Sequence, residues 1–83
     1  MRPDDLRRHV RKQPFQPFRL FITDGSDYLI RHPEHAAVFQ SYVWLGIPGT
    51  DALGQPIERE VEVALLHITR IEPQPPAPAA SAN

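Results

Sequence analysis

Apolar and polar residues alternate through most of this chain, and this period of two predicts short β-strands. The clearest run is 57–66, where isoleucine, valine and leucine alternate with glutamate. Runs 18–23 and 26–31 alternate in the same way and are separated by Asp24-Gly25, a pair typical of a tight hairpin turn. These three runs predict a hairpin and a later, longer strand.

The run 36–45 predicts a further strand that is apolar on both faces. Alternation places Val43 and Leu45 on one face, and Tyr42 and Trp44 on the other. Such a strand is either central or covered by a partner, and we favour partial exposure of Tyr42 and Trp44, closed by self-association. Because tyrosine and tryptophan are enriched where proteins meet, these two residues are the candidate protein interface.

Residues 2–12 predict one short helix. Pro3 suits the first helical turn, where its missing N–H leaves no bond unmade. Asp4 and Asp5 follow in that turn, whereas Arg11 and Lys12 fall in the last turn, so the charges complement the helix dipole. About three turns with few apolar residues cannot remain helical alone, so this helix is expected to pack on a sheet or on another subunit.

The elements together predict a mainly β fold with an N-terminal helix, forming a small, strongly bent five-stranded antiparallel sheet or barrel of the Sm-like or SH3-like kind. One domain is expected over 1–73, with a one-turn corner at 67–69 and a closing strand at 70–72. Residues 46–56 carry three of the four glycines and predict a mobile loop. The Pro/Ala-rich segment 74–83 predicts a disordered tail.

The amino-acid composition excludes some kinds of site and location. The chain has 83 residues and no cysteine, which excludes disulfides and thiolate zinc sites. No signal peptide is recognised, and the longest apolar stretch, 38–47, is too short to span a bilayer. We therefore expect a cytoplasmic protein without a membrane partner.

Charge is divided unevenly along the chain. Residues 1–31 carry a net charge of +3 and residues 32–83 a net charge of −4. Such asymmetry is found at nucleic-acid faces, at head-to-tail contacts between subunits, and on ordinary solvated surfaces. The basic side chains of the helix are the candidate RNA-binding residues: Arg7, Arg8, Arg11 and Lys12.

Only one cluster has the residue types of a metal site, namely His32, Glu34 and His35. Its spacing spans Pro33, and the only candidates for a further, distant ligand are His9 and His67, so we favour a structured corner and expect no metal and no cofactor. Ser26 has no glycine elbow around it, and its neighbouring aspartates suit turn chemistry. We expect no catalytic residues and no enzyme.

The run Pro14-Phe15-Gln16-Pro17-Phe18, followed by Asp24-Gly25 and Arg31-His32-Pro33-Glu34, resembles a family of short, uncharacterised bacterial proteins. That resemblance covers roughly the first half of the chain and implies a bacterial origin, without a function.

A more distant resemblance is to the Sm/Hfq group of RNA-binding ring proteins. Phe21-Ile22-Thr23-Asp24-Gly25 resembles the end of their first strand, and the run 67–73 resembles their closing segment. Hfq carries Lys-His at the two positions occupied here by Leu65 and Leu66. The resemblance thus implies the fold and a ring, whereas the RNA pocket does not carry over.

The sequence accordingly predicts a non-catalytic, self-associating interaction module of unknown ligand, present as a homo-oligomer and open to a protein partner. The alternative is an Sm/Hfq-like ring that binds RNA through the basic helix.

Overall fold

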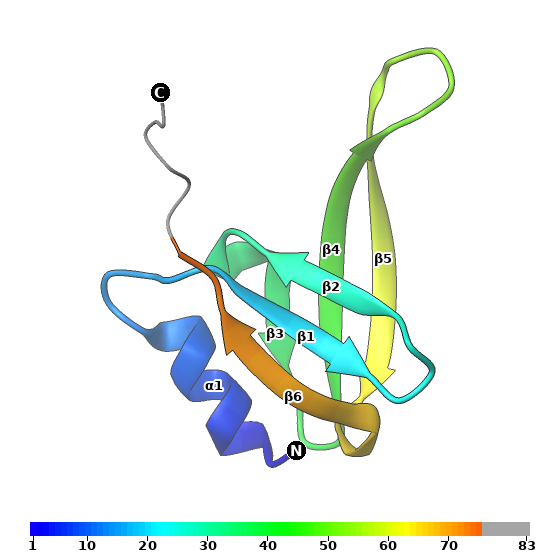
Figure 1. The fold of residues 1–83 in the computed structure, drawn as a ribbon. Coiled ribbons are helices and arrows are strands. Elements are labelled where there is room, and N and C mark those ends of the chain that lie inside the picture. Colours follow the sequence, from blue (N-terminus) through cyan, green and yellow to red (C-terminus); the bar gives the residue numbers. More distant parts are fainter. Residues whose placement is uncertain (76–83) are drawn as a thin grey trace.

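The structure, a computed structural model, describes residues 1–75 and begins with one helix, α1, at Pro3–Arg11 (Figure 1). Pro3 occupies its first turn together with Asp4 and Asp5, as the charge pattern predicted. Leu6 is its one buried residue. No helix in residues 1–75 is long and apolar enough to cross a membrane.

Six strands form two antiparallel sheets of three strands each. The first sheet has the order β2-β1-β6 and the second the order β3-β4-β5. Two single-turn 3-10 helices, η1 and η2, connect them. The bounds are β1 Phe18–Ile22, β2 Asp27–Ile30, η1 Pro33–His35, β3 Ala36–Val38, β4 Tyr42–Thr50, β5 Pro56–Ala64, η2 Leu65–His67 and β6 Ile68–Pro73.

The predicted five-stranded barrel, Sm-like or SH3-like, is wrong. Neither of the two sheets closes on itself, and there are six strands. The run predicted as one strand, 36–45, is divided, because a turn at Phe39 returns the chain so that its N–H donates to the carbonyl of Tyr42 at 2.8 Å. This turn makes β3 and β4 an antiparallel pair of their own.

The loop predicted over 46–56 is also wrong in its greater part. β4 continues to Thr50 and pairs with β5, with Gly46 opposite Glu60 and Thr50 opposite Pro56. The end turn is closed by Asp51, whose carboxylate accepts hydrogen bonds from the N–H groups of Leu53 and Gln55, both at 2.9 Å. We call residues 46–60 the arm, which projects from the rest of the molecule (Figure 1).

The one-turn corner predicted over 67–69 lies two residues earlier, as η2. Its position follows from Leu65, which is buried and whose N–H donates to the carbonyl of Ser41 at 2.9 Å. β6 therefore begins already at Ile68 and runs to Pro73. Gln74 still donates its N–H to Pro17, while most of the predicted tail, 76–83, lies outside the described residues.

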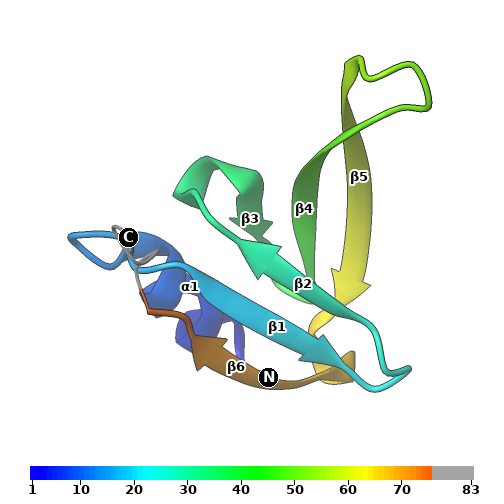
Figure 2. The same cartoon turned by 45° about the horizontal axis from the view of Figure 1, so that its top comes forward.

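The core lies between the two sheets and under α1. Its fully buried members are Leu6 of α1, Phe18 and Leu20 of β1, Ile30 of β2, and Val43 and Leu45 of β4. Figures 1 and 2 place α1 beside β3 and β6, so the helix closes that side of the pair of sheets. The opposite side, where β2 and β5 are the edge strands, leads to the candidate site.

Candidate functional site

The basic residues of α1 are partly neutralised within the helix. Arg7 forms an ion pair with Asp4 at 3.1 Å, and Arg8 forms one with Asp5. Lys12 donates to the side chain of Gln16 at 3.0 Å, and Arg11 is exposed. The helix therefore presents a basic end, which we define as Arg8, Arg11 and Lys12.

The phenylalanines that follow this helix are engaged elsewhere. Phe18 is fully buried, and Phe15 packs edge-on against it with ring centroids 6.0 Å apart. The guanidinium of Arg70 lies 3.8 Å from the ring centroid of Phe21. Stacking of nucleic-acid bases beside a basic surface requires accessible rings, which these three contacts do not favour.

His9 lies between the helix and the core. Its ring packs against Phe18 with centroids 5.5 Å apart. Burial, and then the positive charges of Lys12 and Arg8, hold the pKa of His9 below its ordinary value, and Asp5 opposes this shift only in part. The neutral imidazole is therefore the form that the folded chain favours.

A pH dependence of stability follows from His9. Because its pKa is lower in the folded chain, its contribution is complete above about pH 6.5 and is lost as the pH falls below that value. We expect the free energy of unfolding in urea to decline between about pH 7.5 and about pH 5.5, and less steeply in His9→Gln. The control is His67→Gln, at an exposed histidine. If the stability of His9→Gln declines with falling pH as steeply as that of the unaltered chain and of His67→Gln, this assignment is contradicted.

Tyr42 and Trp44 lie on the outer face of β4, opposite to buried Val43 and Leu45, and both are half-buried. Tyr42 stacks on Phe39 with centroids 4.8 Å apart and planes 17° apart. The indole N–H of Trp44 donates to Glu60 at 3.3 Å. A Cβ at position 46 would lie 2.8 Å from the Trp44 ring, so glycine there lets the indole lie along the strand.

Three glutamates share this outer face. The strand register sets Glu62 opposite Trp44, Glu60 opposite Gly46, and Glu58 opposite Pro48. All three glutamates are exposed. We define the acidic face as Tyr42, Trp44, Glu58, Glu60 and Glu62; it combines half-buried aromatic area with negative charge.

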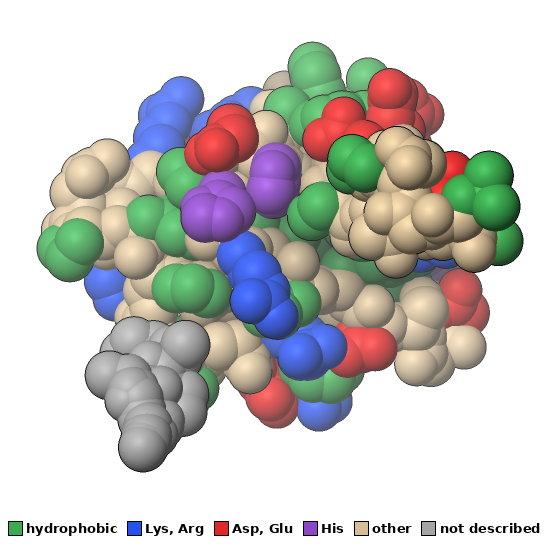
Figure 3. All heavy atoms as spheres, turned by 90° about the horizontal axis from the view of Figure 1, so that it is seen from above, with side chains coloured by type: hydrophobic (Ala, Val, Ile, Leu, Met, Phe, Trp, Pro, Cys, Tyr) green, Lys and Arg blue, Asp and Glu red, His purple; other side chains and the backbone are tan. Residues whose placement is uncertain are grey.

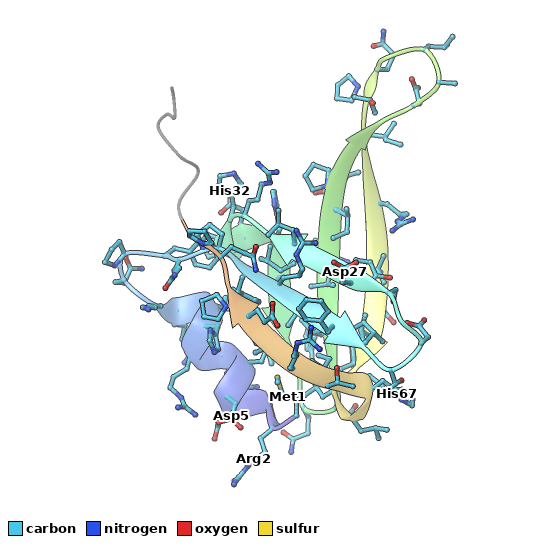
Figure 4. The ribbon with its side chains drawn as sticks, in the orientation of Figure 1. Met1, Arg2, Asp5, Asp27, His32 and His67 are labelled. Atoms are coloured by element: carbon cyan, nitrogen blue, oxygen red, sulfur yellow. The ribbon has the colours of Figure 1, made fainter. Side chains whose placement is uncertain are left out.

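A cleft of about 600 Å³ opens between β2 and the arm, with η1 at one end. Figure 3 looks onto this side of the molecule, where two histidine side chains lie together beside basic side chains, and Figure 4 shows Asp27 in β2 and His32 beyond the end of that strand. We call it the β2–arm cleft. It is lined by Asp27, Tyr28, Leu29, Arg31, His32, His35, Ile47, Pro48 and Arg59.

The charge of the β2–arm cleft is positive. Its only acidic lining residue, Asp27, is paired with Arg19 at 2.6 Å. Neither Arg31 nor Arg59 takes part in an ion pair among residues 1–75. Two guanidinium groups thus remain available to a ligand.

A second hollow, of about 380 Å³, lies between the β1–β2 turn and β5. Its polar groups are used in local structure: the carboxylate of Asp24 accepts from the N–H of Ser26 at 2.9 Å and from its hydroxyl at 2.6 Å. These bonds from Ser26 hold the pKa of Asp24 below its ordinary value. The arrangement is a turn of the Asx type, as predicted for these residues.

The proposed corner around His32 and His35 forms η1. The two imidazole rings meet edge-on with centroids 5.2 Å apart. Within residues 1–75, no group of three histidine, aspartate or glutamate side chains is arranged to hold a metal ion. Glu34, the third member of the sequence cluster, is exposed on the same turn.

Sequence reasoning missed Arg59 and Tyr28 as site residues, because they come from strands far apart in the chain. One signal was available. Arg59 is the only charged residue among the alternating positions Ile57, Arg59, Val61 and Val63, which share the side of β5 that is buried at Val63 and exposed at Ile57 and Arg59.

No protein-family model, no curated protein and no solved structure matches this chain, so its resemblance to short bacterial proteins and to the Sm/Hfq group remains a prediction from sequence.

Proposed function

We propose that this chain is a non-catalytic interaction module that associates with copies of itself, head to tail, through the basic end of α1 and the acidic face. The observation that carries the proposal is the placement of these two oppositely charged surfaces on opposite sides of the molecule. Figure 1 shows α1 on one side and β4–β5 on the other. A contact between unlike surfaces of two copies is heterologous and extends to a ring or a chain of subunits.

The acidic face has the composition of an interface. Trp44 and Tyr42 offer half-buried aromatic area of the kind that dominates binding energy when a partner covers it. The three glutamates around them are opposite in charge to Arg11 and Lys12, the two cations of the basic end that are not paired with Asp5. Complementary charge steers association and fixes the orientation of the partner.

The structure of the arm is a further reason to expect that this chain binds a partner. It is a two-stranded ribbon, and β5 is an edge strand. Two-stranded ribbons are marginally stable alone, and an open edge strand is a template for pairing. Both features favour association on the β5 side of the molecule.

A charge-exchange experiment tests the proposal. Sedimentation of the unaltered chain is expected to show oligomers that weaken as salt rises, since exposed charges are screened. The variants Glu58→Lys/Glu62→Lys and Arg11→Glu/Lys12→Glu are each expected to be monomeric. Their equimolar mixture is expected to associate again, because the reversed helix of one variant fits the reversed strand of the other.

The control is Glu34→Lys, an exposed charge change on η1 outside both surfaces, which should leave association unaltered. A chain that stays monomeric at about 100 µM overturns the proposal. So does a mixture of the two variants that fails to associate while circular dichroism shows both folded. RNA binding by a monomeric chain, lost in Arg11→Glu/Lys12→Glu, would favour the RNA-binding alternative instead.

A further inference from the structure

We propose that the β2–arm cleft binds a small organic phosphate, namely a phosphate monoester carried on a flat, apolar body. This ligand site goes beyond self-association and uses residues outside both the basic end of α1 and the acidic face.

The phosphate would be held by Arg31 and Arg59. They reach the cleft from different walls, one at the end of β2 and the other on β5. A guanidinium binds phosphate oxygens through two parallel N–H donors, which makes arginine better suited than lysine to this role. Because Asp27 is already paired with Arg19, the cleft contains no free acid that would repel the ligand.

Arg59 is an exposed cation on a side of β5 whose other members are apolar. It shares its side of β5 with Val61 and Val63, which point toward the core, and it lies opposite Ile47. An apolar residue in that place would extend the core side of the sheet along the arm. Local departures from a sequence pattern that is otherwise consistent with the fold are expected at functional sites.

The rest of the lining suits an apolar ring. Tyr28, Leu29, Ile47 and Pro48 supply apolar surface, and the imidazoles of His32 and His35 supply both a flat surface and N–H donors. The volume of about 600 Å³ lies within the range of small-molecule sites. An apolar lining with a few polar or charged groups is the usual make-up of a small-molecule site.

Titration calorimetry with adenosine monophosphate tests the site, supported by amide chemical shifts that locate it. We expect binding with shifts at β2, η1 and the arm. Adenosine has the ring without the phosphate, and inorganic phosphate has the anion without the ring. Each is expected to bind more weakly than adenosine monophosphate. Phenyl phosphate should bind with the same set of shifts, since it keeps the ester and a ring.

Arg59→Gln is expected to weaken adenosine monophosphate binding roughly tenfold to hundredfold, the equivalent of one charged hydrogen-bonding partner. The matched control is Arg2→Gln, an exposed arginine at the far end of the molecule from His32 (Figure 4), which should leave binding unaltered. A short single-stranded RNA that binds more tightly than the mononucleotide, with the same dependence on Arg59, would identify a nucleotide unit of a strand as the source of the phosphate.

Three results would overturn the proposal. They are no binding of adenosine monophosphate at about 1 mM, equal affinity for adenosine and its monophosphate, and binding that Arg59→Gln leaves unaltered. Amide spectra of Arg59→Gln confirm that the variant is folded, so that a loss of affinity reports on the missing cation. The outcome is separable from self-association, because neither arginine belongs to the surfaces proposed for that contact.

Discussion

Leu6→Ala is expected to lower the free energy of unfolding by about 2–5 kcal/mol, the usual effect of truncating a fully buried leucine. Leu6 is the one buried residue of α1 and has no exposed surface. Its removal takes apolar area from the core and leaves a cavity where the helix meets the sheets. For a domain of this size, with a total stability of about 5 kcal/mol, the loss is a large fraction.

The same substitution at Leu53 is the control. Leu53 lies at the end of the arm and is 84% exposed, so Leu53→Ala should change the unfolding free energy by less than about 0.5 kcal/mol. Urea unfolding followed by tryptophan fluorescence measures both variants. Equal losses in the two variants would mean that α1 does not close the core as described.

Gly25→Ala is expected to destabilise the fold by about 1–2 kcal/mol through backbone strain alone. Gly25 follows β1 in the tight turn to β2 and has a φ of +91°, a conformation that side-chain-bearing residues rarely adopt. A Cβ there would meet no atom within 4 Å. The expected loss therefore comes from the Cβ against its own local backbone, and not from a clash with more distant residues.

Gly49 provides the matched control, since a Cβ there also meets nothing within 4 Å and its backbone belongs to β4. Gly49→Ala should be neutral or slightly stabilising, because alanine restricts the unfolded chain. Thermal unfolding of the two variants compares the positions directly. A Gly25→Ala variant as stable as Gly49→Ala would contradict the positive φ.

The two proposals meet on β5. Its outer side carries Glu58, Glu60 and Glu62, for which we propose a contact with a second copy, while Arg59 lies on the side of the β2–arm cleft. A single strand would thus serve a protein contact with one set of side chains and a ligand with the other. The charge-exchange variants and Arg59→Gln change separate faces, so each proposal can fail alone.

Local patterns predicted much of the secondary structure. The helix over 2–12 was found at Pro3–Arg11, since proline and charge placement mark its ends. The hairpin around Asp24-Gly25 was found because only glycine accepts the required backbone angle without strain. The arm was missed: its glycines and prolines suggest a loop, but Asp51 closes a turn that lets the two strands pair out to Thr50 and Pro56.

The candidate sites, like the secondary structure, could be predicted from the sequence only in part. Alternation placed Tyr42 and Trp44 together on one face of a strand, and the structure shows them there. It could not reveal that Glu58, Glu60 and Glu62 lie on that face, because this depends on the pairing register of β4 with β5. The neutralisation of Arg7 and Arg8 by Asp4 and Asp5 depends likewise on rotamers within the helix.

Local patterns in the sequence are enough to predict a mainly β chain with one N-terminal helix, a glycine hairpin and an uneven distribution of charge. These properties can be read from the sequence because they depend on the spacing of apolar side chains, on the residues of single turns and on residue counts, and not on contacts between distant segments. The pairing of distant segments makes the strands form two open sheets, lets α1 cover one side of them, and brings Arg31 and Arg59 to one cleft on the other side. These arrangements bring together residues far apart in the chain. They depend on the register of strand pairing and on which apolar faces pack against each other.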